Sequence, residues 1–147
     1  MARGLNSLRD NRSAEKTGKI PAADRLTTLL VDDDDFVLKS MPSFLSRVPE
    51  IEVVGTARDG VEALEKLRIS QPKIVLMDVR MPRMGGIEAA VIMLREFPKL
   101  RVVLTSGIDD PEMRAECLAT GAHGFMAKLE VITQFPMLVK LMFGTAA

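Results

Sequence analysis

Short apolar segments alternate with segments of helical periodicity from Leu26 almost to the end of the chain. The apolar segments are rich in β-branched residues, which is typical of strands that are buried on both faces of a parallel sheet. We therefore expect five strands, in LTTLLV (26–31), IEVVGTA (51–57), KIVLMDV (73–79), RVVLTSG (101–107) and HGFMAK (123–128).

The segments between these strands place apolar residues three and four positions apart. In VEALEKL, Val61, Leu64 and Leu67 share one helical face, and charged residues occupy the other. Residues 85–97 and 111–120 follow the same spacing. Strands that alternate with helices predict a doubly wound α/β domain, in which a five-stranded parallel sheet is flanked by five helices.

Two prolines interrupt this pattern. Pro42 lies within the helical segment 35–48, where it should kink or split the helix. Pro136 fits best in the first turn of a helix, so we expect the last helix to begin near Phe135. This start implies a rather long loop after Lys128.

The composition fits one compact domain and argues against several classes of protein. The chain has 147 residues, 47% of them hydrophobic, and its net charge is zero. Neutrality gives no support to nucleic-acid binding by this domain, since such surfaces are usually basic. The apolar runs are too short to span a membrane, which takes about 20 residues. The single cysteine, Cys117, suits a reducing compartment, and we expect it to be buried in a helix.

The first 24 residues differ from the rest of the chain. They are polar and mildly basic, and they show no apolar periodicity. We expect residues 1–24 to be a disordered extension and residues 25–147 to form the domain.

Polar side chains stand at the carboxyl ends of four of the five predicted strands. In open α/β sheets ligands bind at the carboxyl ends of the strands, so these side chains should meet at one edge. Carboxylates there could hold Mg²⁺, and one of them could act as a nucleophile toward a phosphoryl group. A lysine and a hydroxyl could neutralise and hydrogen-bond the phosphoryl oxygens. The residues at these strand ends are Asp32 and Asp33, Asp78, Thr105 and Ser106, and Lys128.

Some of these residues could instead have purely structural roles, which are common for such residue types. The four carboxylates Asp32–Asp35 could be the solvated start of a helix, because Asp is favoured at N-caps and in first turns. His123 opens the fifth strand beside glycines and has no His or Cys nearby in sequence, so we predict a structural role for it.

The motifs VDDDDF, MDVRMPRMGG, VVLTSG and GFMAK resemble the receiver domain of bacterial two-component response regulators. The resemblance covers roughly residues 26–143 and is strongest with receivers that precede a helix-turn-helix domain. It implies a flavodoxin-like sheet of strand order 2-1-3-4-5. It also implies either a stand-alone receiver or a fragment that ends before its effector domain.

The resemblance assigns a role to each strand-end residue. Asp78 would accept a phosphoryl group, and Asp33, Asp32 and the backbone carbonyl of Arg80 would join it in binding Mg²⁺. Asp34 and Asp35 would be only the N-cap and first turn of the first helix. The remaining roles would be a switch hydroxyl for Thr105 beside Ser106, a phosphate-binding cation for Lys128 and a switch aromatic for Phe125.

The resemblance further implies a cytoplasmic protein that takes its phosphoryl group from a histidine kinase or a phosphotransfer protein. A surface of the fourth helix, fifth strand and fifth helix could then mediate homodimerisation, without nucleic-acid or membrane binding by this domain. One departure is Leu129, since many receivers have proline after the conserved lysine.

Two rival functions share parts of this motif set. A Mg²⁺-dependent phosphohydrolase would also use an aspartyl nucleophile, but it should have a second Asp two residues later, where this chain has Arg80, and a cap over its substrate. A degenerate receiver would only bind partners, and the intact set of acidic residues, hydroxyl and lysine argues against it. The predicted protein is therefore a phosphoacceptor signalling module and not an enzyme.

Overall fold

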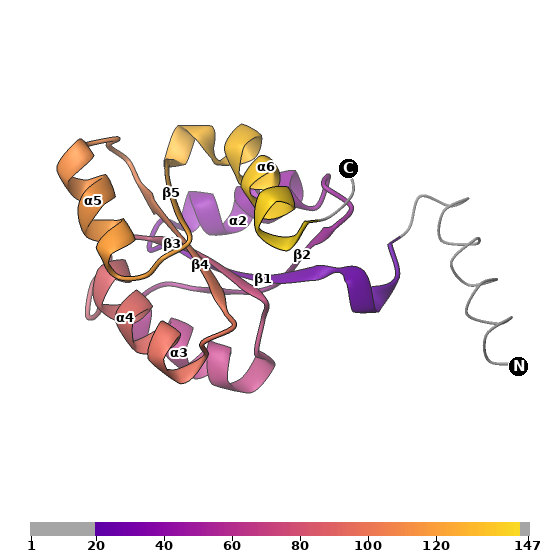
Figure 1. Ribbon diagram of the computed structural model, residues 1–147, viewed down its shortest axis with the longest axis horizontal. Helices are drawn as coiled ribbons and strands as arrows, with labels where there is room; N and C mark the ends of the chain where they lie inside the picture. The colour runs from indigo at the N-terminus through magenta and orange to yellow at the C-terminus, as the bar shows by residue number, and fades with distance from the viewer. Residues whose placement is uncertain (1–19, 145–147) are drawn as a thin grey trace, which may run out of the picture.

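A computed structural model describes residues 20–144. Its centre is a parallel sheet of five strands in the order β2-β1-β3-β4-β5, which confirms the predicted fold class and strand order (Figure 1). The strands are β1 (Leu26–Val31), β2 (Ile51–Ala57), β3 (Ile74–Asp78), β4 (Arg101–Ser106) and β5 (Gly124–Ala127).

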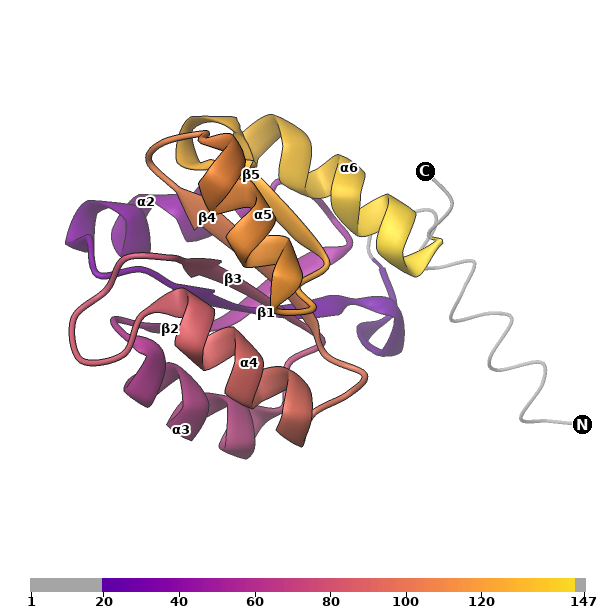
Figure 2. The same cartoon turned by 60° about the vertical axis from the view of Figure 1, so that its left-hand side comes forward.

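Helices cover both faces of the sheet (Figure 2). Helices α3, α4 and α5 pack on one face, and α2 and α6 pack on the other. The helices are α2 (Asp35–Leu45), α3 (Gly60–Ser70), α4 (Gly86–Glu96), α5 (Pro111–Ala119) and α6 (Val131–Phe143), with short 3-10 turns η1 (Ala22–Asp24) and η2 (Lys128–Glu130).

The core consists of two apolar layers, one on each face of the sheet. Successive residues of a strand point to opposite faces, so Leu29 and Val31 enter the layer under α3 and α4, whereas Leu30 enters the layer under α2 and α6. Apolar residues of the helices close both layers, and Cys117 is buried in the first of them as predicted.

Three helices begin at an aspartate that caps their first turn. Asp34 accepts a hydrogen bond from the backbone N–H of Phe36 at 2.8 Å, which confirms its predicted role as the N-cap of α2. Asp59 and Asp110 cap α3 and α5 in the same way. Of the four consecutive carboxylates, the last two thus belong to the start of α2.

The prediction that the last helix begins near Phe135 was wrong, and Pro42 does not split its helix, so a kink there stays a prediction. Helix α6 begins at Val131, several residues before Phe135, and a 3-10 turn takes the place of the expected long loop. Val131, Phe135 and Val139 are buried at a spacing of four, and this burial offsets the hydrogen bond that Pro136 cannot donate. Pro42 also lies inside a helix, but α2 is not split and ends soon after it.

Residues 20–24 are the described part of the predicted N-terminal extension. They include η1, and the Lys73 ammonium donates to the backbone carbonyls of Ala23 at 3.1 Å and Arg25 at 3.2 Å. Residues 1–19 lie outside the described part, so disorder there stays a prediction. Across residues 20–144, no helix is both long and apolar enough to cross a bilayer.

Candidate metal and phosphoryl site

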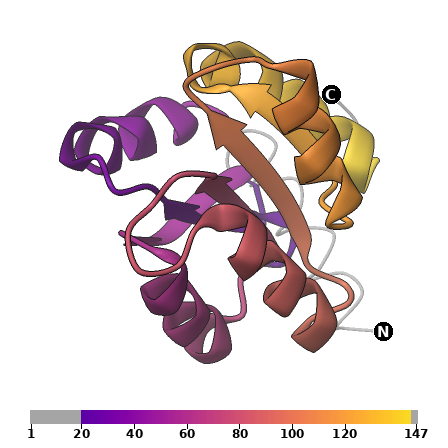
Figure 3. The ribbon, with the colours of Figure 1, turned by 90° about the vertical axis from the view of Figure 1, so that its left-hand side faces the viewer.

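The register of the sheet aligns the carboxyl ends of its central strands. Val31 pairs with Met77, and Asp78 pairs with Thr105 on β4. The residues that follow β1 and end β3 and β4 therefore meet at one edge of the sheet, the edge that Figure 3 views. This alignment brings together residues that are far apart in the sequence.

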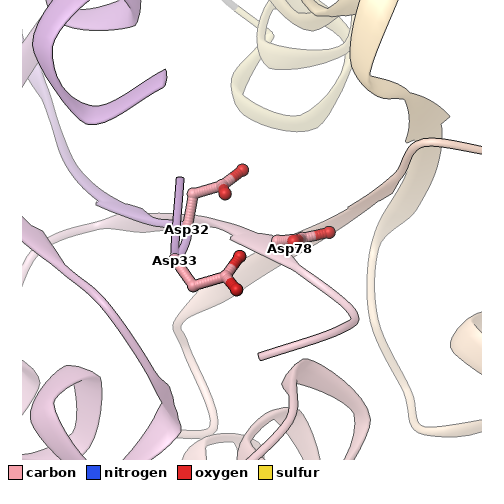
Figure 4. A group of neighbouring side chains, drawn as sticks. All are labelled: Asp32, Asp33 and Asp78. Atoms are coloured by element: carbon pink, nitrogen blue, oxygen red, sulfur yellow. The ribbon is translucent and has the colours of Figure 1, made fainter. Parts of the chain in front are cut away.

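Three carboxylates converge at this edge. One oxygen from each of Asp32, Asp33 and Asp78 lies within 4.8 Å of the others, and the side chains project to the same side of the strand ends (Figure 4). Asp32 is only 2% exposed and Asp78 4%, whereas Asp33 is exposed. Buried, clustered carboxylate oxygens repel one another and suit a hard divalent cation, so the donor set fits Mg²⁺.

Lys128 is the cation that the protein itself supplies to this cluster. Its Nζ atom lies 3.0 Å from Asp32 Oδ2 and 3.0 Å from Asp78 Oδ2. Lys128 directly follows β5, and its side chain is about three-tenths exposed. A single ammonium group thus bridges the two buried carboxylates and remains accessible from outside.

The electrostatics of the site favour extra positive charge. Burial raises the pKa of Asp78, Lys128 lowers it, and the neighbouring Asp32 and Asp33 raise it again, so that it lies above its ordinary value. Burial lowers the pKa of Lys128, but its bonds to Asp32 and Asp78 outweigh this effect and raise it overall. The lysine therefore stays charged while the acidic cluster is only partly neutralised.

The predicted switch residues differ in their surroundings. Thr105 is buried at the end of β4, and the backbone N–H of Val79 donates to its carbonyl at 2.9 Å. The Ser106 hydroxyl accepts from Ile108 N–H at 3.2 Å and so stabilises its own turn. Phe125 is buried in the layer under α3–α5, with the Arg114 guanidinium 5.1 Å above its ring.

The loop after Asp78 folds back closely on the end of β3. The backbone N–H of Gly86 donates to the carbonyl of Val79 at 2.8 Å. A Cβ atom on Gly86 would collide with the carbonyl oxygen of Asp78, and one on Gly85 would lie 2.9 Å from that of Val79. The glycine pair of the MPRMGG motif is therefore required by this close approach. Arg80 lies in the same loop with its side chain exposed.

Two polar contacts were missed by the sequence analysis, one in the loop after Asp78 and one at the opposite end of the sheet. Arg83 Nε donates to Asp59 Oδ2 at 2.8 Å, and Val102 N–H donates to His123 Nδ1 at 3.1 Å. The second contact gives His123 the structural role that was predicted in general terms. No sequence signal links Asp59 with Arg83, because their separation matches no helical or hairpin period.

The chain belongs to the response regulator receiver domain family, whose model matches residues 28–137. Over 119 residues it is 36% identical to the response regulator GacA of Pseudomonas syringae pv. syringae, covering 81% of this chain and 56% of that protein. Over 100 residues it is 37% identical to the transcriptional regulatory protein LnrK of Bacillus subtilis, and this match covers 68% of this chain and 46% of that protein. The chain thus spans about half the length of these curated relatives.

Solved structures agree with this assignment. The signal receiver domain of the putative response regulator NarL from Mycobacterium tuberculosis is 31% identical, with a TM-score of 0.71 over 82% of this chain and 95% of that one. A protein-glutamate methylesterase of Pyrococcus abyssi is 35% identical, but the match covers only 28% of its length. The likeness to that enzyme therefore concerns a receiver-like part and gives no support to esterase activity here.

Proposed function

We propose that the chain accepts a phosphoryl group on Asp78 from the phosphohistidine of a histidine kinase or phosphotransfer protein. The observation that supports this most is the Lys128 ammonium group, which bridges the buried carboxylates of Asp78 and Asp32 at 3.0 Å each. In the proposed step an Asp78 oxygen forms a bond to phosphorus. The P–N bond of the donor breaks, and its electron pair returns to the imidazole.

Asp32, Asp33 and Asp78, with the backbone carbonyl of Arg80, would hold Mg²⁺ at this site. The three clustered carboxylates support the assignment. The bound ion would lower the cost of bringing a phosphoryl group to an acidic cluster. Asp33 is exposed and offers an entry path, while the buried Asp32 carboxylate is fixed by the Asp34 N–H at 2.9 Å.

The other strand-end residues would act on the phosphoryl oxygens. Lys128 would exchange its contact with the Asp78 carboxylate for one with the phosphoryl group, and the Thr105 hydroxyl would donate a hydrogen bond to it. Movement of Thr105 would free space for Phe125 and shift the surface of α5, β5 and α6 between two states. The pairing of Thr105 with Asp78 in the β-ladder supports the proposed contact between the Thr105 hydroxyl and the phosphoryl group.

An apolar groove beside the site supports docking of the phosphoryl donor. The groove has a volume of about 340 Å³, and its lining includes Asp32 and Lys128. At its mouth Phe36 is 75% exposed and Leu129 is 96% exposed. Exposed apolar side chains next to a reactive centre are typical of a protein-binding site. The leucine that departs from the family pattern would then contact the partner.

The surface of α5, β5 and α6 supports a second proposed interaction, phosphorylation-dependent homodimerisation. A shallow groove of about 580 Å³ lies there, and exposed apolar side chains from two helices line it, namely Leu118, Met137 and Leu141.

We also place the chain in the cytoplasm, where its buried single cysteine would remain reduced, and propose no nucleic-acid or membrane binding for this domain.

Incubation with Mg²⁺ and acetyl phosphate tests the proposed reaction against its rivals. We expect one added phosphoryl group per chain by intact mass, dependent on Mg²⁺ and absent from Asp78→Ala. Release of many equivalents of phosphate without a stable adduct would favour the phosphohydrolase. Neither adduct nor turnover, with a histidine kinase also failing as donor, would favour a module that only binds partners.

A further inference from the structure

The loop between β3 and α4, residues 79–85, is fastened at its far end to the turn before α3. Arg83 Nε lies 2.8 Å from Asp59 Oδ2 in an ion pair. The next residue of each segment adds a backbone bond, because Gly60 N–H donates to the carbonyl of Met84 at 2.8 Å. A Cβ on Gly60 would lie 2.7 Å from the Met84 side chain, so the two segments are in close contact.

Arg83 has a backbone conformation that is unfavourable for arginine. Its φ of 62° lies in the left-handed region, where glycine and asparagine are at ease and an arginine is not. Its side chain is 61% exposed, so burial does not offset this cost. What the arginine gains, and glycine could not, is the bond from its guanidinium to Asp59.

Asp59 is well suited to hold that guanidinium. Its side chain is only 7% exposed, and its second oxygen, Oδ1, accepts from the N–H of Glu62 at 2.9 Å as the cap of α3. Burial raises the pKa of Asp59, but the bonds from Arg83 and Glu62 N–H outweigh this effect and hold it below its usual value. The carboxylate is therefore charged and fixed at the end of a helix that is part of the core.

The near end of the same loop adjoins the acidic cluster. Val79 follows Asp78 directly, its N–H donates to the Thr105 carbonyl, and its own carbonyl accepts from Gly86 N–H. Arg80, whose backbone carbonyl is the fourth protein ligand in the proposed function, lies between this end and Arg83. The loop is thus held at both ends, with the carbonyl ligand in the span between them.

We propose that Arg83 is a positioning residue for the Mg²⁺ site, which it serves by pairing with Asp59 and so fixing the loop that contains the Arg80 carbonyl. This inference rests on the proposed function, because it assumes that the acidic cluster binds Mg²⁺. A ligand on a fixed loop loses less freedom when the ion binds, and partners that orient metal ligands commonly affect affinity. Loss of the pair should weaken Mg²⁺ binding without removing any ligand.

The test is a Mg²⁺ titration followed by backbone amide NMR signals, since the chain contains no Trp or Tyr for fluorescence. Arg83→Gly removes the guanidinium and also the backbone strain of the left-handed conformation, so the variant should fold. Asp59→Asn removes the charge and keeps a good helix cap. Arg68→Ala is the matched control, because Arg68 makes a two-bonded pair with Glu96, at 2.9 and 2.6 Å, on the surface of α3 and α4.

We expect Arg83→Gly and Asp59→Asn each to raise the Kd for Mg²⁺ about three- to tenfold, less than the loss seen when a partner orients a ligand directly. The double variant should match the single ones, Arg83→Lys should recover part of the loss, and Arg68→Ala should bind as wild type does. An unchanged Kd in Arg83→Gly, or an equal loss in Arg68→Ala, would overturn the inference.

Asp33→Asn separates this inference from the proposed function. If Asp33→Asn abolishes Mg²⁺ binding and Arg83→Gly leaves it unchanged, only the positioning role fails. If the wild-type chain does not bind Mg²⁺, the proposed metal site fails, and the positioning role fails with it.

Discussion

Lys128 and Asp78 form an ion pair across the end of the sheet, with Nζ 3.0 Å from Oδ2. Lys128 follows β5, and Asp78 ends β3. These two strands are not neighbours in the sheet, because β4 lies between them. The pair therefore depends on the strand order, and its lysine also contacts Asp32 at 3.0 Å. The Lys128 ammonium group therefore lies where the proposed phosphoryl group on Asp78 would need a cation.

Asp78→Asn should stabilise the fold at neutral pH in the absence of Mg²⁺. Burial and the neighbouring carboxylates raise the pKa of Asp78 in the folded state. The resulting stability is present below the ordinary pKa of 3.8 and is lost as the pH rises through the raised value, so the ionised group destabilises at pH 7. We expect Tm to rise by about 2–5 °C, the scale of roughly 1 kcal/mol in a domain of this size.

Thermal unfolding at pH 7 and pH 4 checks this expectation. The gain should shrink at the lower pH, where the wild-type carboxyl becomes protonated. Glu116→Gln, an exposed carboxylate on α5, is the control and should change Tm little. A fall in Tm for Asp78→Asn at pH 7 would mean that the bond to Lys128 outweighs the repulsion.

Lys128→Met should slow phosphorylation by acetyl phosphate by about 10²-fold, the usual effect of removing one group that stabilises charge in a transition state. The substitution keeps much of the side-chain volume and removes the ammonium between Asp32 and Asp78. The rate of adduct formation at saturating Mg²⁺ measures the effect. A rate within twofold of wild type would show that Lys128 is not needed for the transfer.

Stability should fall as the pH drops below 6.5, in part because of His123. Burial and the charge of Arg101 lower the pKa of His123 in the folded state. The stability that the neutral ring contributes is present above the ordinary pKa of 6.5. It is lost as the pH falls through the lowered pKa of the folded state, because the protonated Nδ1 can no longer accept the N–H of Val102. Urea unfolding of wild type and His123→Gln between pH 7.5 and 5 should show a smaller pH dependence in the variant. Equal slopes would contradict this assignment.

Leu129→Asp should slow phosphoryl transfer from a histidine kinase and leave acetyl phosphate labelling nearly unchanged. The reason is that a protein donor would bury this exposed leucine. Replacing an anchor residue at an interface typically costs about 1–3 kcal/mol of binding free energy. Ile69→Asp is the control, since Ile69 is 85% exposed on α3 on the other face of the sheet. Similar losses with both donors would point to damage at the site instead of lost docking.

The strands and the acidic residues at their ends could be predicted from local sequence signals, whereas the strand order was implied by the resemblance to receiver domains. A strand that ends in Asp78 is visible as a buried apolar run, and parallel packing brings such ends together. The start of α6 was misplaced because local proline chemistry was weighed above the apolar spacing of Val131, Phe135 and Val139. The pair of Asp59 and Arg83 could not be found, because it joins two loops through tertiary packing alone.

The most direct test of the central claim is to identify the phosphorylated residue itself. The chain would be labelled with acetyl phosphate and Mg²⁺, treated with borohydride, which converts an aspartyl phosphate to homoserine, and digested for peptide mass analysis. We predict homoserine at position 78 in wild type, dependent on Mg²⁺ and absent from Asp78→Asn. Homoserine at position 32 or 33, or a labelled chain with none, would contradict the assignment of Asp78 as the phosphoacceptor.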